Sequence, residues 1–192
     1  MKKIVLTTAC AIAALTACAG TMQQTTAMPM ASDTKMVGGA PMYPSRDIVD
    51  NAVQSKEHTT LVAAVKAAGL VPTLKSAGPF TVFAPTDAAF AELPPGTVDT
   101  LLKPENKAML GKVLTYHVVP GRLDAAALAQ QIRAGHGRAL LKTASGGMLT
   151  ATMNGSAIEI SDEKGDHAMV TTSDVYQSNG VIHVVDKVLL PG

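Results

Sequence analysis

The stretch Gly78–Phe90 constrains the fold more than any other part of the chain, because it holds all three phenylalanines of the sequence. It reads GPFTVFAPTDAAF. The segment Phe80–Ala84 is rich in aromatic and β-branched residues and predicts a buried strand, which Pro85 ends because proline has no N–H to give to a ladder. We expect Thr86 to cap a helix that Asp87 begins. In a chain that is 3% aromatic, this strand-to-helix unit marks the predicted centre of the core.

Hydrophobic periodicity divides the rest of the chain into helical and strand segments. Helices are predicted at residues 45–53, 59–68, 70–74, 97–102, 104–114 and 124–132. Strands are predicted at residues 116–119, 138–144, 148–153, 157–161, 169–176 and 181–189. Gly146-Gly147 and Asn154-Gly155 separate neighbouring strands and are typical of hairpins, since their glycines accept positive φ. The pattern predicts an α+β domain in which helices cover an antiparallel meander.

The N-terminus is expected to be a targeting segment. Two lysines precede the apolar stretch Ile4–Leu15, which is too short to span a bilayer. The next residues, Leu15-Thr16-Ala17-Cys18, resemble the lipobox of bacterial lipoproteins, in which the cysteine becomes the acylated first residue. Residues 1–17 are then a signal peptide, and the exported protein is lipid-anchored to the cell envelope through Cys18. Ala19, where aspartate would argue for the inner membrane, favours the outer membrane; ordinary signal-peptide cleavage is the alternative.

Residues 18–43 show no apolar periodicity and are predicted to form a flexible tether that leads to one domain at 44–191. This segment is rich in methionine, whose thioether is a soft ligand that suits Cu(I). A copper or small-ligand carrier is therefore the alternative function. The alternative for the methionines is that they fill a linker, or that one of them docks on the domain. The candidate metal ligands are Met28, Met30, Met36 and Met42.

Composition argues against several classes of function. The formal net charge is +1 with no basic stripe, so no nucleic acid is expected as a partner. The only cysteines are Cys10 and Cys18, both in the leader region, so the mature domain lacks a thiol nucleophile. There is no Gly-x-Ser-x-Gly elbow and no phosphate-binding glycine loop. We therefore expect no enzyme activity, no catalytic residue and no cofactor.

Two of the five histidines, His117 and His183, lie in apolar runs. They could pair as metal ligands or as a pH switch. The alternative, which we favour, is that each ring satisfies a buried backbone group, as a buried polar side chain must. His58 opens a predicted helix and is expected to be solvated.

Three segments, in order along the chain, resemble the signature motifs of fasciclin (FAS1) domains. Gly78–Phe90 is similar to the first signature, Tyr116-His117 to the Tyr-His motif, and Asn179–Pro191 to the second signature. The resemblance covers about Pro44–Pro191. It implies a wedge-shaped β-sandwich with helices packed alongside. It also implies a secreted or surface-tethered module for adhesion or ligand binding, without catalytic activity.

The Tyr-His motif is the candidate binding surface that the resemblance implies. In animal members the corresponding segment has been tied to integrin-dependent adhesion, which makes Tyr116 and His117 candidates here. The alternative, which we favour, is a structural role for the tyrosine hydroxyl or the imidazole, because alternate residues of a strand face opposite sides and one of the two must point inward. The partner is then expected to be a protein, glycan or matrix ligand, and the membrane is reached through the N-terminal lipid.

Overall fold

The structure is a computed structural model that describes residues 34–94 and 96–192. The predicted signal peptide, Cys18, Met28 and Met30 lie outside the described residues. Within the described ranges, no helix combines the length and the apolar character needed to cross a bilayer.

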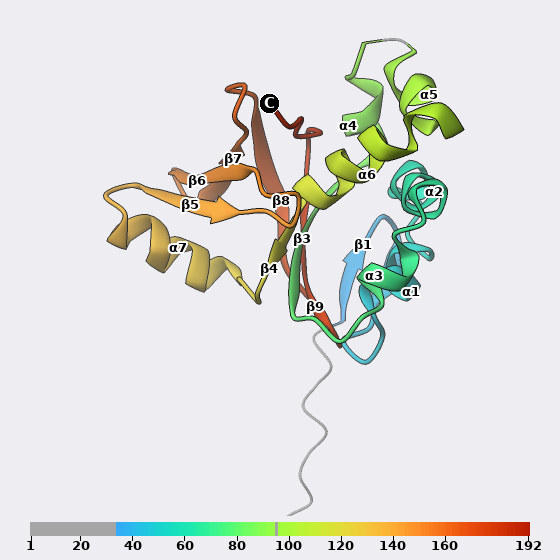
Figure 1. Cartoon of the computed structure of the whole chain (residues 1–192). Helices are drawn as coiled ribbons and strands as arrows, with labels where there is room; N and C mark the ends of the chain where they lie inside the picture. Colours follow the sequence, from blue (N-terminus) through green and yellow to red (C-terminus); the bar gives the residue numbers. More distant parts are fainter. Residues whose placement is uncertain (1–33, 95) are drawn as a thin grey trace, which may run out of the picture. The chain divides into compact units, whose positions relative to one another are not determined.

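Seven strands form one mixed sheet with the order β4-β3-β9-β8-β7-β6-β5 (Figure 1). From β5 to β9 consecutive strands pair antiparallel, which confirms the predicted meander. β3 is inserted beside β9 in parallel, with Phe83 opposite His183, and β4 pairs antiparallel with its other edge. The strands are β3 (Phe80–Pro85), β4 (Val118–Pro120), β5 (Arg138–Lys142), β6 (Met148–Asn154), β7 (Ala157–Ser161), β8 (His167–Gln177) and β9 (Gly180–Val185).

The long strand β8 joins the two halves of this sheet. It pairs with β7 near its start and with β9 along its length, with register shifts on either side of Thr172. The two edge strands also meet, because the backbone N–H of Ala144, just beyond β5, donates to the carbonyl of Val118 in β4 at 2.7 Å. The sheet thus folds over on itself, and the expected α+β sandwich with helices alongside is confirmed.

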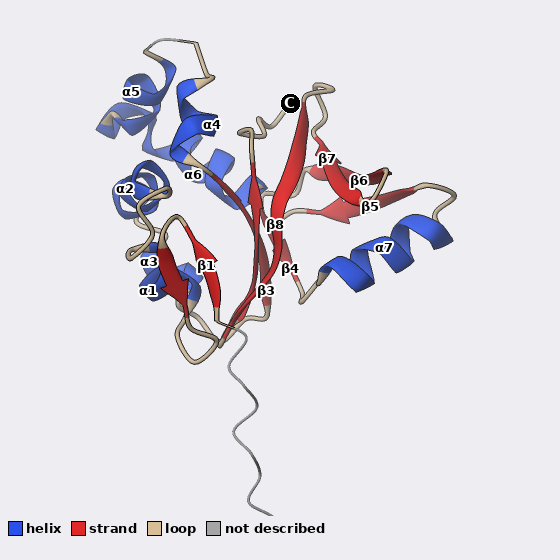
Figure 2. Ribbon diagram, turned by 180° about the vertical axis from the view of Figure 1, so that it is seen from behind, coloured by secondary structure: helices blue, strands red, loops and turns tan. Residues whose placement is uncertain are grey.

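The helices cover the sheet unequally (Figure 2). One group of helices, from α1 to α6, gathers beside the β3–β9 half, whereas α7 packs against β5 and β6. The helices are α1 (Ile48–Ala52), α2 (Thr59–Ala68), α3 (Val71–Leu74), α4 (Asp87–Ala91), α5 (Thr97–Leu102), the 3-10 turn η1 (Pro104–Asn106), α6 (Lys107–Tyr116) and α7 (Ala125–Ala134).

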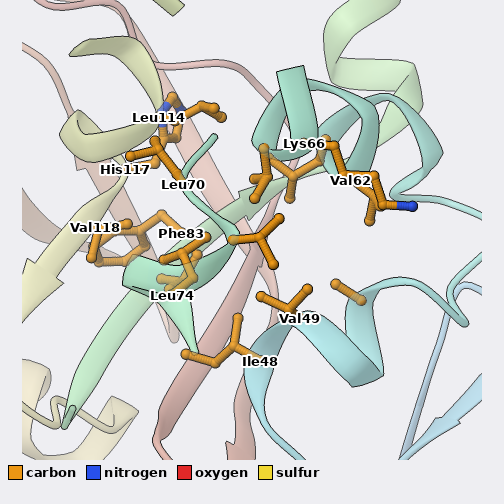
Figure 3. A pocket seen from close by; sticks show the side chains of 15 residues that line it. Ile48, Val49, Val62, Lys66, Leu70, Leu74, Phe83, Leu114, His117 and Val118 are labelled. Carbon is orange, nitrogen blue, oxygen red and sulfur yellow. The ribbon is translucent and has the colours of Figure 1, made fainter. Parts of the chain in front are cut away.

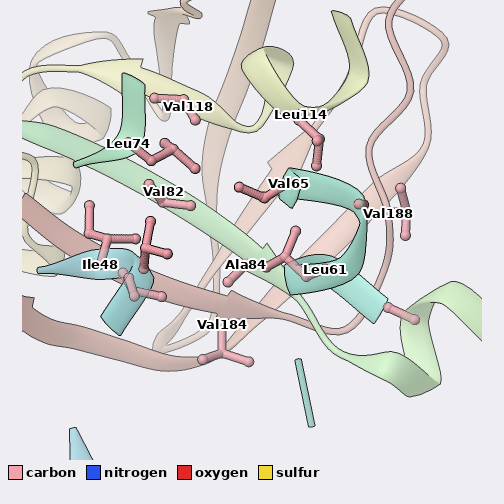
Figure 4. Close-up of a cluster of buried hydrophobic side chains, with 14 of the residues drawn as sticks. Ile48, Leu61, Val65, Leu74, Val82, Ala84, Leu114, Val118, Val184 and Val188 are labelled. Atoms are coloured by element: carbon pink, nitrogen blue, oxygen red, sulfur yellow. The ribbon is translucent and has the colours of Figure 1, made fainter. Parts of the chain in front are cut away.

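Two hydrophobic clusters lie on opposite faces of β3. Val82 and Ala84 belong to the cluster beneath the helices (Figure 4), whereas Phe83 belongs to the cluster that α7 closes. Successive side chains of a strand alternate between faces, so a strand buried on both faces reads as a continuous apolar run. The Gly78–Phe90 unit is central, as predicted, but its rings differ: Phe83 is 0% exposed, Phe90 9%, and Phe80 is only partly buried.

The tether prediction is wrong for residues 34–43. They form a hairpin of β1 (Lys35–Val37) and β2 (Ala40–Met42), and Val37 and Met42 are buried in the cluster beneath the helices. Lys35 Nζ donates to the carbonyl of Ser173 in β8 at 2.7 Å. The apolar alternation in each strand spans only three residues, too short to stand out in a segment rich in glycine and methionine.

Several element boundaries also differ from the prediction, among them the end of α6 and the start of α1. The strand predicted at 116–119 begins only at Val118, because α6 continues through Tyr116 and ends on His117. Leu110, Val113 and Leu114 are spaced as on one face of a helix, and Tyr116 continues this helix. The run Tyr-His-Val-Val, taken by itself, indicates a strand instead. Helix α1 begins at Ile48 rather than at residue 45, because Asp47 is its N-cap residue. The Asp47 side chain accepts the N–H of Asp50.

Candidate functional site

Tyr116, one of the two candidate surface residues, is fully buried. Its ring is 0% exposed and belongs to the cluster closed by α7. The hydroxyl donates to the carbonyl of Met148 at 2.9 Å and accepts the N–H of Glu163 at 3.2 Å. Burial raises the pKa of the Tyr116 phenol above its ordinary value. The side chain therefore ties the end of α6 to β6 and to the β7–β8 loop.

His117 is equally enclosed, with 3% of its surface exposed. Its Nε2 accepts the backbone N–H of Leu189 at 3.0 Å, so the proton of the neutral ring lies on Nδ1, which donates to the carbonyl of Val113 at 2.8 Å. Burial lowers the pKa of His117 to about 4, and the imidazole is neutral at neutral pH. Since neither Tyr116 nor His117 reaches solvent, the prediction that they form a binding surface is wrong, and their role is structural.

His183 has the same kind of role. It stacks on Phe83 with ring centroids 5.7 Å apart. Its Nε2 donates to the carbonyl of Leu123 at 2.7 Å, and Nδ1 accepts the N–H of Asp174 at 3.4 Å. Burial lowers the pKa of His183. In both His117 and His183, each ring nitrogen is hydrogen-bonded to a backbone group. This confirms the favoured interpretation, in which each ring satisfies buried backbone groups.

His58 is the polar residue that sequence reasoning misplaced. It is 2% exposed, although a solvated position was expected. Its Nδ1 lies 2.8 Å from the hydroxyl of Ser55, and Nε2 has no hydrogen-bond partner among the described residues. Burial lowers the pKa of His58, against the opposing charges of Asp87 and Glu57. Its neighbours Ala84 and Met42 belong to β3 and β2. The sequence around residue 58 does not indicate that these two strands lie beside it, so its burial could not be predicted.

The described methionine candidates do not converge on a site. Met36 and Met42 lie on the paired strands β1 and β2, but Met36 is 64% exposed and Met42 is 2% exposed. Their side chains therefore face opposite sides of the hairpin. Among residues 34–94 and 96–192, no group of three or more His, Cys, Asp or Glu side chains is placed to hold a metal ion.

An apolar cavity lies between α1, α2, α3, α6 and β3 (Figure 3). Its volume is about 40 Å³. Aliphatic side chains such as Ile48, Leu74 and Val82 form its walls, and the ring of His117 borders it with both nitrogens already bonded. No polar atom of the lining, which includes Lys66, faces the cavity, and its size excludes a ligand of more than a few heavy atoms.

The larger depressions are open to solvent. One of about 330 Å³ lies beside Arg46 and Asp50. Another of about 450 Å³ runs between the end of α7 and β5, from Gln131 to Leu140.

Comparison with known proteins identifies what the chain resembles. The family model described as the fasciclin domain matches residues 56–191. Protein sll1483 of a Synechocystis species is 49% identical over 144 residues, covering 75% of this chain and 73% of that protein. Immunogenic protein MPB70 of Mycobacterium bovis is 34% identical over 145 residues, covering 73% of this chain and 66% of that protein.

More distant relatives share the fold as one part of longer chains. The transforming growth factor-beta-induced protein ig-h3 of Oryctolagus cuniculus is 32% identical over 148 residues, and the match covers 20% of that protein. Among solved structures, a FAS1 domain pair from the insect cell adhesion molecule Fasciclin I superposes with a TM-score of 0.69 at 18% identity. That match covers 77% of this chain and 52% of the other.

Proposed function

The chain belongs to the fasciclin-domain family, and we propose that it is a non-catalytic binding module that promotes adhesion or matrix association at the cell envelope. The observation that carries the proposal is the fold shared with a domain pair of the insect cell adhesion molecule Fasciclin I. The open depressions beside α1 and β5 offer surface for a macromolecular partner. The tyrosine and the histidines of the sequence motifs are engaged in internal hydrogen bonds.

The proposal includes export and lipid anchoring. A lipobox with Cys18 supports both, and acyl chains on one residue hold a protein firmly because each buried methylene contributes about 0.8 kcal/mol. The folded domain begins by Lys35, the first residue of β1, so the segment between Cys18 and the hairpin would link the domain to the lipid.

The experiment is a deletion strain complemented with either the wild-type protein or Cys18→Ser. Wild type is expected to restore adhesion and biofilm formation and to fractionate with membranes, whereas Cys18→Ser is released from them. A deletion strain with unchanged adhesion, biofilm and envelope phenotypes would contradict the binding function. A Cys18→Ser protein that stays in the membrane fraction with its leader removed would contradict only the anchor.

Copper carriage is supported less well. Met42 would have to leave the core to bind a metal, and Met28 and Met30 lie outside the described residues. Titration of the mature chain with Cu(I), against a version that begins at Thr34 and keeps the hairpin, separates the alternatives. Equal uptake by the two proteins would exclude a role for the preceding segment.

A further inference from the structure

The strand β5 leaves one edge of the sheet open. It stands at the end of the strand order and pairs only with β6 among the described strands. The N–H of Thr143 donates to Gly147 on the β6 side at 2.9 Å. Because backbone groups alternate in direction along an antiparallel pair, Leu141 and Ala139 also face β6. The N–H and C=O groups of Leu140 and Lys142 consequently point away from it.

The two ends of this open edge are closed by other parts of the fold. The N–H of Arg138 donates to the carbonyl of Gly135 at 3.4 Å, and that of Ala144 donates to Val118 of β4 at 2.7 Å. Between these contacts, Leu140 and Lys142 have no described strand to pair with. The unpaired backbone from Leu140 to Lys142 is therefore short, and hydrogen bonds on either side of it hold it in place.

An apolar groove accompanies the free backbone. The depression of about 450 Å³ is lined by Gln131, Ala134 and Gly135 from the end of α7 and by Arg138, Ala139 and Leu140. Leu140 is 65% exposed, although it lies in the middle of a strand. A large apolar side chain on an unpaired edge strand is a position at which another chain can pair with the sheet.

The charges beside Leu140 select the partner. Arg138 and Lys142 lie on the same face of β5 as Leu140, two residues to either side. Neither has an ion-pair partner among the described residues. If a second copy paired antiparallel about Leu140, each Arg138 would stand opposite the other copy's Lys142, and like charges directly opposite destabilise a pair.

We propose that the open edge of β5 binds an extended acidic segment of a partner protein by strand addition. The segment carries an apolar residue opposite Leu140 and a carboxylate two residues to either side. These carboxylates reach the side chains of Arg138 and Lys142 without backbone pairing at Arg138, whose outward N–H is already bonded to Gly135. Main-chain hydrogen bonds to Leu140 hold the strand, and the alternate side chains supply the selectivity. The proposal rests on the binding function proposed above and names the chemical class of its partner.

The test measures fluorescence polarisation of a labelled peptide, acetyl-Thr-Glu-Thr-Val-Thr-Glu-Thr-amide, titrated with the mature chain. The control peptide has lysine in place of both glutamates. Leu140→Pro removes the outward N–H and leaves the ladder to β6 intact, since proline is tolerated where the N–H faces solvent. The double variant Arg138→Glu and Lys142→Glu reverses the charge and keeps the backbone.

The wild type is expected to bind the glutamate peptide about tenfold or more tightly than the lysine peptide, and the double variant to reverse that preference. Leu140→Pro should weaken binding by about tenfold or more. If Leu140→Pro does not fold, as judged by its thermal melt, the double variant decides alone. No saturable binding by the wild type, or equal affinity of wild type and double variant for both peptides, would overturn the proposal.

Two further outcomes also overturn it. A dimer of the wild type in sedimentation, lost in Leu140→Pro, would assign the edge to a second copy. Full rescue of adhesion in the deletion strain by the double variant would remove the edge from the binding function, while the proposed function itself would stand.

Discussion

Asp87 caps a helix that is not its own: its Oδ2 accepts the hydroxyl of Thr59 at 2.6 Å and the N–H of Thr59 at 3.2 Å. Oδ1 accepts the N–H of Thr60 at 2.9 Å. The N-cap residue of α2, His58, provides no side-chain cap, so the carboxylate satisfies N–H groups that would otherwise lack partners. Desolvation opposes ionisation, but the hydrogen bonds from Thr59 and Thr60 outweigh it and lower the pKa of Asp87. The strand-to-helix unit is thereby fastened to α2.

Asp87→Ala should destabilise the domain by about 1–2 kcal/mol, the range for loss of a helix cap. Asp99→Ala is the matched control, because Asp99 also lies in the first turn of a helix and is exposed. Urea unfolding of both variants beside the wild type measures the difference. Equal midpoints for the two variants would show that the contacts to α2 contribute nothing.

Stability should fall as the pH drops from about 6.5 towards 4. Burial lowers the pKa of His117 from 6.5 to about 4, so between these values the unfolded chain binds a proton that the folded chain does not. The contribution is complete above the unfolded pKa and decreases with falling pH, by up to about 3 kcal/mol. His183 shifts in the same direction. Urea unfolding at several pH values should give His117→Asn a lower but flatter profile; parallel profiles would contradict this assignment.

Phe83→Ala should cost about 3–5 kcal/mol, the range for truncation of a buried aromatic side chain. Phe83 is 0% exposed and stacks on His183. Phe80→Ala, on the same strand but only partly buried, should cost clearly less. Thermal melts rank the two variants. A Phe83→Ala protein that melts like the wild type would show that β3 does not hold the core.

Met42→Ala should cost about 2–5 kcal/mol, and Met36→Ala close to nothing. The two residues share one hairpin but differ in exposure, 2% against 64%. Chemical denaturation of both variants tests whether the hairpin belongs to the folded domain. Wild-type stability in both would restore the tether reading of this segment.

Local signals in the sequence predict most of the elements. Thr86 accepts the N–H of Ala89 as the expected cap of α4, and α2 runs from Thr59 to Ala68 before Gly69 takes a positive φ. In each case the residue that decides the structure lies within one turn of the element it ends or begins. The meander could be predicted for the same reason, because the turn residues Gly146-Gly147 and Asn154-Gly155 lie next to the strands that they connect.

Contacts between distant segments could not be predicted in this way. Asn179 reads as a turn residue, yet its Oδ1 accepts the N–H of Ile48 at 3.1 Å and its Nδ2 donates to the carbonyl of Leu74 at 2.7 Å. The burial of Tyr116 and His117 likewise depends on Met148 and Leu189, which local periodicity does not connect to them. The candidate surface is therefore the edge of β5 and not the Tyr-His motif. The period of two predicted the strand β5, but it could not predict that β5 lies at the edge of the sheet.

The parallel pairing of β3 with β9 sets an order of events for the growing polypeptide. The central strand, Phe80–Pro85, obtains this neighbour only when Gly180–Val185 has been synthesised, and loop closure over that span is slow. Until then, the edge of β3 that later pairs with β9 carries backbone N–H and C=O groups without their native partners.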